Sequence, residues 1–140
     1  MEVRKRIVVI GLGSIGMRHA RLFTENPRVD LEICDSNPET LGRALEELAG
    51  LPSDGVGSPP AATRAYSSFP EVIGSKPDAL LIATPHTEHA GQAISALERD
   101  IHVLCEKPMS DSLSSARKML EASKRSEAIL SIGFMLHFRP

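Results

Sequence analysis

The fold is decided at residues 7–16, which read Ile-Val-Val-Ile-Gly-Leu-Gly-Ser-Ile-Gly. A short β-branched run predicts a buried strand, and three glycines in the spacing G-x-G-x-x-G follow it directly. Helical signals begin at Ser14, so these glycines lie between a strand and a helix. There Gly11 permits a tight turn, Gly13 lets the backbone approach a pyrophosphate, and Gly16 lets the helix pack closely. Because a helix N-terminus attracts phosphate charge, the stretch predicts a dinucleotide site.

Strand and helix patterns alternate along the rest of the chain, which is typical of βαβ units around a parallel sheet. Short apolar runs predict six strands, at residues 7–10, 31–35, 64–66, 79–83, 102–105 and 129–132. Helices are expected from Ser14 to before Asn26, after an Asn37-Pro38 cap, as a turn at 70–73, around 90–97, and after a Ser112 cap. The sequence therefore predicts an α/β fold, a doubly wound, mostly parallel Rossmann sheet in the order 3-2-1-4-5-6. We expect residues 1–140 to form one three-layer α/β/α domain.

The helix faces that pack on this sheet are predicted from the spacing of large apolar residues. The first helix presents Ile15, Leu22 and Phe23 on one side, and the last presents Leu113, Ala116 and Leu120. Residues 50–60 hold three Gly, three Pro and two Ser, which predicts a surface loop before the third strand.

An acidic residue, Asp35, ends the second strand about 20 residues after the glycine turn, where a carboxylate accepts both hydroxyls of an adenosine ribose. A cap for the following helix is the alternative role, but it does not explain the position at a strand end. The same charge would repel a 2′-phosphate, and Ser36-Asn37 offers no arginine to hold one. NAD is therefore the expected cofactor. NADP is the less favoured alternative. Arg43 could hold its 2′-phosphate, but this arginine lies a helical turn or more beyond Asn37.

Composition excludes several classes of protein. The chain has 140 residues, of which 41% are hydrophobic and 24% charged, and its net charge is −2. That charge, with one Tyr, four Phe and no Trp, predicts no nucleic-acid partner. No run approaches the ~18 apolar residues of a membrane helix, and glycines interrupt the only signal-like start. We expect a cytoplasmic protein that does not bind membranes and has no metal site.

The two cysteines, Cys34 and Cys105, are each predicted at a strand end. In the expected strand order they lie three strand spacings apart, about 14 Å, whereas a disulfide needs Cα atoms within about 7 Å. We expect both to be free, buried thiols.

Polar residues follow two further strands at the edge of the sheet where ligands bind. Residues 84–89, Thr-Pro-His-Thr-Glu-His, come after the fourth strand, and Glu106-Lys107-Pro108 comes after the fifth. In an open α/β sheet the ligand crevice lies outside the carboxyl ends of the strands. Both segments are therefore expected to face the cofactor cleft.

With these residues in place, the chain resembles the Gfo/Idh/MocA family, named after glucose-fructose oxidoreductase, inositol dehydrogenase and rhizopine catabolism. The resemblance covers the whole chain, and Glu106-Lys107-Pro108 is its most specific element. Its other elements are the glycine turn with His19, Asp35, Ala83-Thr84-Pro85 with His89, and Gly133-Phe134 with Pro140. The resemblance implies a dehydrogenase moving hydride between NAD and a sugar, cyclitol or related hydroxyl compound.

The resemblance also implies roles for single residues. Lys107 corresponds to the active-site lysine beside the nicotinamide, and the Lys107-Pro108 bond to one that is cis in the family. His89 is either a cofactor neighbour or a structural residue, and His19 is expected to pack. The expected cofactor-binding residues are Gly11, Gly13, Ser14, Ile15, Gly16, Asp35, Ala83, Thr84, Pro85, His89, Glu106 and Lys107. His86, His137 and Met135 depart from the family pattern, which puts their contacts in doubt.

The family's C-terminal substrate domain is absent from residues 1–140, so we expect cofactor binding without efficient turnover by this chain alone. That expectation does not hold if the chain is a fragment or pairs with a partner. A non-catalytic dinucleotide-binding module or subunit is the alternative function, and a Rossmann domain for another nucleotide is a third. The apolar tail with Phe134, Met135, Leu136 and Phe138 predicts possible homo-oligomers.

Overall fold

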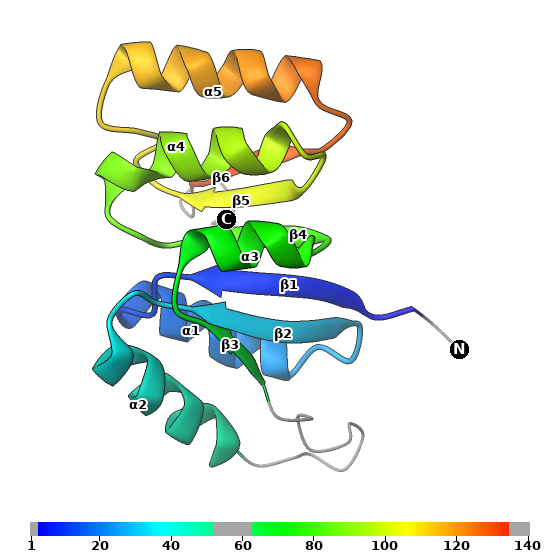
Figure 1. Ribbon diagram of the computed structural model, residues 1–140, viewed down its shortest axis with the longest axis vertical. Coiled ribbons are helices and arrows are strands. Elements are labelled where there is room, and N and C mark those ends of the chain that lie inside the picture. The colour runs from blue at the N-terminus through cyan, green and yellow to red at the C-terminus, as the bar shows by residue number, and fades with distance from the viewer. Residues whose placement is uncertain (1–2, 52–62, 135–140) are drawn as a thin grey trace, which may run out of the picture.

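A six-stranded parallel sheet with helices on both faces forms the fold (Figure 1). The computed structural model describes residues 3–51 and 63–134. Its strands are β1 Lys5–Ile10, β2 Val29–Cys34, β3 Arg64–Tyr66, β4 Ala79–Ile82, β5 His102–Glu106 and β6 Leu130–Gly133. Its helices are α1 Ser14–Thr24, α2 Pro38–Ala49, α3 Phe69–Ser75, α4 His86–Leu97 and α5 Leu113–Arg125.

The strand order is β3-β2-β1-β4-β5-β6, which confirms the predicted doubly wound Rossmann fold. The chain winds outward from β1 to β3, then returns through α3 to place β4 on the other side of β1. In the register Ile10 is paired with both Cys34 and Ile82. The segments that follow β1, β2 and β4 therefore leave the sheet at the same end, where the carboxyl ends of the strands lie.

Alternate strand residues feed two separate cores. Val8, Leu80 and Val103 point to the face covered by α3, α4 and α5. Val9, Ile33 and Leu81 point to the opposite face, covered by α1 and α2. Figure 1 shows this arrangement, with α3 in front of the strands and α1 behind β1 and β2. The central strands are consequently apolar on both faces, as a covered parallel sheet requires.

The predicted starts of α2 and α5 are confirmed by side-chain caps, whereas α4 begins at His86, earlier than predicted. The side chain of Asn37 accepts hydrogen bonds from the backbone N–H groups of Glu39 and Thr40, at 2.9 and 3.2 Å. The hydroxyl of Ser112 accepts one from the N–H of Ser115 at 3.1 Å. None of the helices in the described ranges is long and apolar enough to cross a membrane.

Two predicted helix faces are only partly right, because Phe23 of α1 and Ala116 of α5 are partly buried whereas the other predicted residues are exposed. In α1, Ile15 and Leu22 are 45% and 56% exposed, and the buried residues are Gly16, Met17 and Ala20. In α5, Leu113 and Leu120 are exposed, and Met119 and Ala122 are buried instead. The reason in α1 is that small side chains let the helix approach the sheet, so the contact face follows Gly16 and Ala20. A search for large apolar residues misses that face.

Strand boundaries shift by one to two residues. β1 and β2 begin at Lys5 and Val29, ahead of the predicted starts, while β6 begins at Leu130 and leaves Ile129 exposed. The predicted loop at 50–60 lies almost wholly outside the described residues, as do residues 135–140. Self-association through the apolar tail therefore stays a prediction.

The two cysteines are free and buried, as predicted, on β2 and β5. β1 and β4 lie between those two strands. Burial raises the pKa of each thiol to about 12, and the neighbouring carboxylates Asp35 and Glu106 add to the effect on Cys34 and Cys105 respectively. Both cysteines are therefore neutral packing residues.

A buried carboxylate on β2, that of Glu32, connects several elements at the end of the sheet away from the glycine turn. Its side chain is 8% exposed and accepts hydrogen bonds from Arg6 Nε at 2.9 Å and Arg6 Nη2 at 3.1 Å. Tyr66 donates its hydroxyl to the same carboxylate at 2.8 Å. Arg6 also donates to the carbonyl of Ser75, so β1, β2, β3 and α3 meet at one charge. The hydrogen bond to Glu32 raises the pKa of Arg6.

Replacing Arg6 by methionine should lower the free energy of unfolding by about 3 kcal/mol, because the buried Glu32 carboxylate then keeps only Tyr66 and the more distant Arg64, at 4.0 Å. Urea unfolding followed by circular dichroism measures the loss. Arg21→Met is the control, since Arg21 pairs with Glu47 at the surface and such pairs contribute little. An equal loss in both variants would contradict a special role for the buried carboxylate.

Candidate functional site

The glycine turn after β1 lies in direct contact with the end of β4. Gly11 has a φ of +86°, a backbone conformation that side-chain-bearing residues rarely adopt. A Cβ there would lie 2.7 Å from the carbonyl carbon and oxygen of Ala83. The N–H of Gly11 donates to the carbonyl of Cys34, and that of Ala83 donates to Ile10. Only glycine fits this crossing of three strand ends.

The other two glycines of the turn have different surroundings. A Cβ on Gly16 would lie 1.7 Å from the carbonyl oxygen of Gly11, so the helix packs directly on the turn. A Cβ on Gly13 would meet nothing within 4 Å. Gly13 is the N-cap of α1, no side chain caps that helix, and its first turn holds no acidic residue. The space beside Gly13, at the N-terminus of α1, is therefore open, and a phosphate can lie there.

Asp35 lies at the same edge, one strand away, and is fixed by two backbone groups. Its Oδ2 accepts from the N–H of Leu12 at 2.9 Å, inside the glycine turn. Its Oδ1 accepts from the N–H of Asn37 at 2.8 Å. The cap of α2 is Asn37 rather than Asp35. Each carboxylate oxygen keeps accepting capacity, so Asp35 is oriented and can still accept hydrogen bonds from hydroxyl groups.

The segment after β4 is held by a chain of side-chain hydrogen bonds. Thr84 donates its hydroxyl to Gln92 Oε1 at 2.7 Å, and Gln92 Nε2 donates to Glu88 at 3.0 Å. Gln92 is 8% exposed, which makes it one of the few buried polar side chains in the described ranges. Sequence analysis did not single out Gln92, because its position in α4 resembles an ordinary helical glutamine.

His89, at the end of the first turn of α4, is 1% exposed. Its Nδ1 lies 2.9 Å from the carbonyl oxygen of Pro108, and its Nε2 lies 2.8 Å from that of Thr84. Both ring nitrogens are therefore engaged with the backbone. The ring joins the segment after β4 to the segment after β5.

The end of β5 carries Glu106, Lys107 and Pro108, and the Lys107-Pro108 bond is cis, as the resemblance implied. Lys107 is exposed at the edge of the sheet. Glu106 Oε1 lies 2.7 Å from Nε2 of His19, which comes from α1. His19 was expected only to pack, and the structure gives it a polar contact that spacing alone does not indicate.

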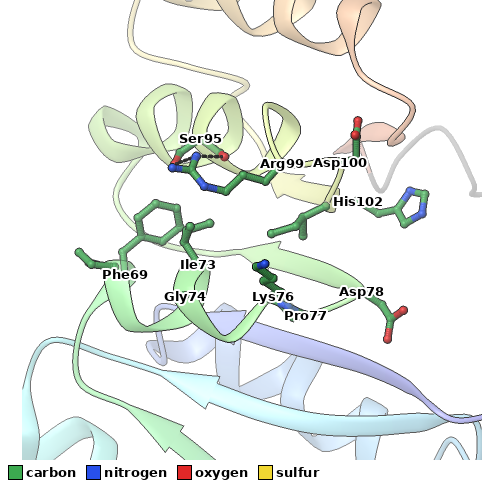
Figure 2. A pocket seen from close by; sticks show the side chains of 12 residues that line it. Phe69, Ile73, Gly74, Lys76, Pro77, Asp78, Ser95, Arg99, Asp100 and His102 are labelled. Carbon is green, nitrogen blue, oxygen red and sulfur yellow. Dashed lines mark hydrogen bonds between the residues drawn. The ribbon is translucent and has the colours of Figure 1, made fainter.

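Two hollows in the described ranges differ in their position relative to these residues. One of about 360 Å³ lies between α1 and α2 and is lined by Leu12, Gly13 and Ser14 together with Arg43. Arg43 thus lies nearer the glycine turn than its distance along the sequence suggests. A second hollow of about 940 Å³ lies between α3 and α4, with Phe69 and Arg99 on opposite sides (Figure 2).

The second hollow is larger but lies away from the predicted site. Asp78, just before β4, and His102, the first residue of β5, line it. It therefore opens at the amino ends of the strands, whereas the glycine turn, Asp35 and Lys107 follow carboxyl ends. Ligands of open α/β sheets bind at the carboxyl ends, so we assign the candidate site to that edge.

The predicted site residues come from four neighbouring strand ends. The turn after β1, Asp35 after β2, Ala83-Thr84-Pro85 after β4, and Glu106-Lys107 at β5 all lie at the carboxyl edge of the sheet. His86 is exposed at the start of α4. Met135 and His137 lie outside the described residues.

Comparison with known proteins agrees with this geometry. The Gfo/Idh/MocA sequence profile, described as an oxidoreductase family with an NAD-binding Rossmann fold, matches residues 5–134. Inositol 2-dehydrogenase of Mycolicibacterium smegmatis is 35% identical over 140 residues, which are 96% of this chain and 37% of that protein. The scyllo-inositol 2-dehydrogenase (NAD(+)) of Bacillus subtilis is 32% identical over 143 residues, 100% of this chain and 38% of that protein.

A solved structure shows the same fold. The WlbA dehydrogenase from Bordetella pertussis, in complex with NADH and UDP-GlcNAcA, superposes with a TM-score of 0.77 at 29% identity. The match covers 92% of this chain and 36% of that one. The chain thus spans less than two fifths of the length of these relatives.

Two glycine variants should separate the phosphate site from the fold. Gly13→Ala should leave stability nearly unchanged and weaken NADH binding at least about tenfold, because its methyl group enters the open space beside the α1 N–H groups. Gly16→Ala should lower the unfolding midpoint, because its methyl group overlaps the Gly11 carbonyl. Thermal unfolding and NADH fluorescence titration measure the two effects. Unaltered NADH binding by folded Gly13→Ala would place the phosphates elsewhere.

Proposed function

Because the chain belongs to the Gfo/Idh/MocA family of oxidoreductases and is its NAD-binding Rossmann domain, we propose that it serves a dehydrogenase. The proposed reaction moves hydride between NAD and a hydroxyl-bearing carbon of a sugar, cyclitol or related compound. The names of the relatives support this substrate class, since they include inositol dehydrogenases and a protein solved with a nucleotide sugar. The remainder of the substrate pocket is proposed to come from protein outside residues 1–140.

One observation carries the proposal, namely the order of the site residues across the sheet. Asp35, the glycine turn, Thr84 and Lys107 follow β2, β1, β4 and β5, which are consecutive in the strand order. With strands about 4.8 Å apart, this row extends about 14 Å, a distance suited to an extended dinucleotide. In this arrangement Asp35 receives the adenosine ribose and the N-terminus of α1 receives the pyrophosphate. The nicotinamide half then lies toward Lys107.

Lys107 is proposed as the catalytic residue. Oxidising an alcohol removes a hydride from carbon and a proton from oxygen, and bound NAD supplies the hydride acceptor. A protonated Lys107 donates a hydrogen bond to the substrate oxygen and holds the reacting carbon in place. A base outside the described residues takes the hydroxyl proton. Glu106 and Pro108, on either side of Lys107, are held by His19 and His89.

Asp35 is proposed to set the preference for NAD. We expect the chain to bind NADH more tightly than NADPH, because the fixed carboxylate accepts both ribose hydroxyls and repels a 2′-phosphate. Asp35→Ser should reduce that preference at least about tenfold in parallel fluorescence titrations. Asp30→Ser, near the amino end of β2, is the control. An unchanged ratio in the folded Asp35 variant would remove this assignment, and tighter binding of S-adenosylmethionine would identify another nucleotide.

The dehydrogenase proposal is tested in the complete protein with a panel of inositols, aldoses and nucleotide sugars, by NADH absorbance. Lys107→Met should lower kcat by about 100-fold or more, because the substrate oxygen loses its partner, and should weaken NADH binding far less, because Lys107 is only one of the residues expected to contact the cofactor. Activity retained in this variant would exclude Lys107 as the catalytic residue. Binding of NADH without oxidation of any such substrate would instead support a non-catalytic dinucleotide-binding module.

A further inference from the structure

Lys107 stands between two residues that are each held by a histidine from a different helix. On one side, Glu106 contacts His19 of α1 at 2.7 Å. On the other, the carbonyl of Pro108 contacts His89 of α4 at 2.9 Å. Lys107 itself is exposed and projects from the backbone between these contacts. The two helices lie on opposite faces of the sheet, so the lysine is supported from both sides.

The His89 contact joins two strand ends. The ring is 1% exposed, and its second nitrogen lies 2.8 Å from the Thr84 carbonyl. Both partners are carbonyl oxygens, which only accept hydrogen bonds. A neutral ring therefore supplies one of the two bonds, and the imidazolium form supplies both. Such a ring fixes the segment after β5 relative to the segment after β4.

The His19 contact joins Lys107 to the helix that carries the glycine turn. The side chains of His19 and Glu106 are 27% and 15% exposed. The Glu106 carboxylate also packs against Gly133 at the end of β6, where an added Cβ would lie 3.4 Å from it. Glu106 is thus confined between α1 and β6. The same helix presents its first N–H groups to the phosphate position, so one rigid element spans both halves of the site.

We propose that His19 and His89 are positioning residues that fix the backbone of Lys107 at the nicotinamide end of the cleft. The proposal rests on the proposed function, in which Lys107 contacts the substrate oxygen. A lysine side chain is long and flexible, so its reach is defined only if its backbone is fixed. Hydride transfer needs reacting atoms in a narrow range of distance and angle, and small displacements of a catalytic group slow it strongly.

A purely structural role for these histidines makes a different prediction. Both would then contribute to stability in the same way as any core residue of α1 or α4. Loss of either would lower the unfolding midpoint and leave the folded site unchanged. The positioning role instead predicts a local change at Lys107 in a molecule that remains folded.

The first experiment measures that local change in the chain itself, without cofactor or substrate. In His89→Phe, the 15N order parameter of the Lys107 amide should fall from about 0.85 to below about 0.6, as expected for a flexible backbone. His89→Gln, which keeps one donor, should be intermediate. Leu97→Val, a core change in the same helix, is the control and should leave the order parameter of Lys107 unchanged. His19→Leu should loosen Lys107 as well, and its half-buried position keeps the test open if His89→Phe does not fold.

The second experiment uses the complete protein and its dehydrogenase rate. His89→Phe and His19→Leu should each lower kcat about tenfold while the Kd for NADH stays within about twofold. Combined with Lys107→Met, neither should slow the enzyme further, since the lysine through which they act is gone. Additive losses would show that the histidines act independently of Lys107.

The two experiments separate failure of this inference from failure of the proposed function. A rigid Lys107 in folded His89→Phe and His19→Leu overturns the positioning role, whatever the enzyme assay gives. A protein without dehydrogenase activity overturns the proposed function, and the order parameters still decide whether the histidines hold Lys107. Loosening of Lys107 together with a non-additive loss of kcat supports both.

Discussion

The backbone of Gly11 touches the backbone of Ala83, and the rest of the site depends on that contact. With any side chain at Gly11, an atom would lie 2.7 Å from the Ala83 carbonyl, and the ends of β1 and β4 would have to separate. Gly16 extends the same constraint to α1, because the helix packs so closely on the Gly11 carbonyl that there is room for the hydrogen atom of a glycine but not for a Cβ. The turn, the helix N-terminus and the end of β4 therefore form one backbone-packed unit. Its shape does not depend on side-chain rotamers.

Asp35 shows how a functional group can also be part of this unit. Its carboxylate binds the N–H of Leu12 within the turn, and so connects β2 to the phosphate position. The carboxylate cannot swing away without releasing that N–H group. A residue that selects a cofactor by its charge is thus oriented by the same hydrogen bond that stabilises the turn. Asp35 can have both a structural and a functional role, because each carboxylate oxygen that accepts a hydrogen bond from a backbone N–H group can accept a further one.

Sequence reasoning recovered the parts of the structure that depend on backbone conformation and on local signals. The glycine spacing, the Asn37 and Ser112 caps and the apolar strands each follow from rules that act within a few residues, and the structure confirms them. The strand order followed from the doubly wound Rossmann arrangement that the alternation of strands and helices predicts. The prediction of the helix faces failed where large side chains are exposed and small ones are buried. Ile15 and Leu22 are large and exposed, whereas Gly16 and Ala20 are small and buried, because close packing selects for the absence of a side chain.

Contacts between distant segments were beyond the sequence for a different reason. His19 and Glu106 are 87 residues apart, and His89 and Pro108 are 19 apart, so no periodicity relates them. Each histidine could be read only as a helical residue that packs or contacts a cofactor. Gln92 likewise gave no signal, although it holds Thr84. Such polar contacts depend on the exact crossing of α1 and α4 over the strand ends, which is a property of the assembled fold.

The two halves of the site consequently differ in what fixes their geometry. The phosphate half is made of backbone N–H groups and glycines, so nearly any substitution there disturbs either the fold or the space for a ligand. The Lys107 half depends on side chains, because His19 holds Glu106 and His89 holds the carbonyls of Pro108 and Thr84. A dinucleotide bound across both halves therefore meets a phosphate site fixed by backbone packing and a reactive end fixed by side-chain hydrogen bonds.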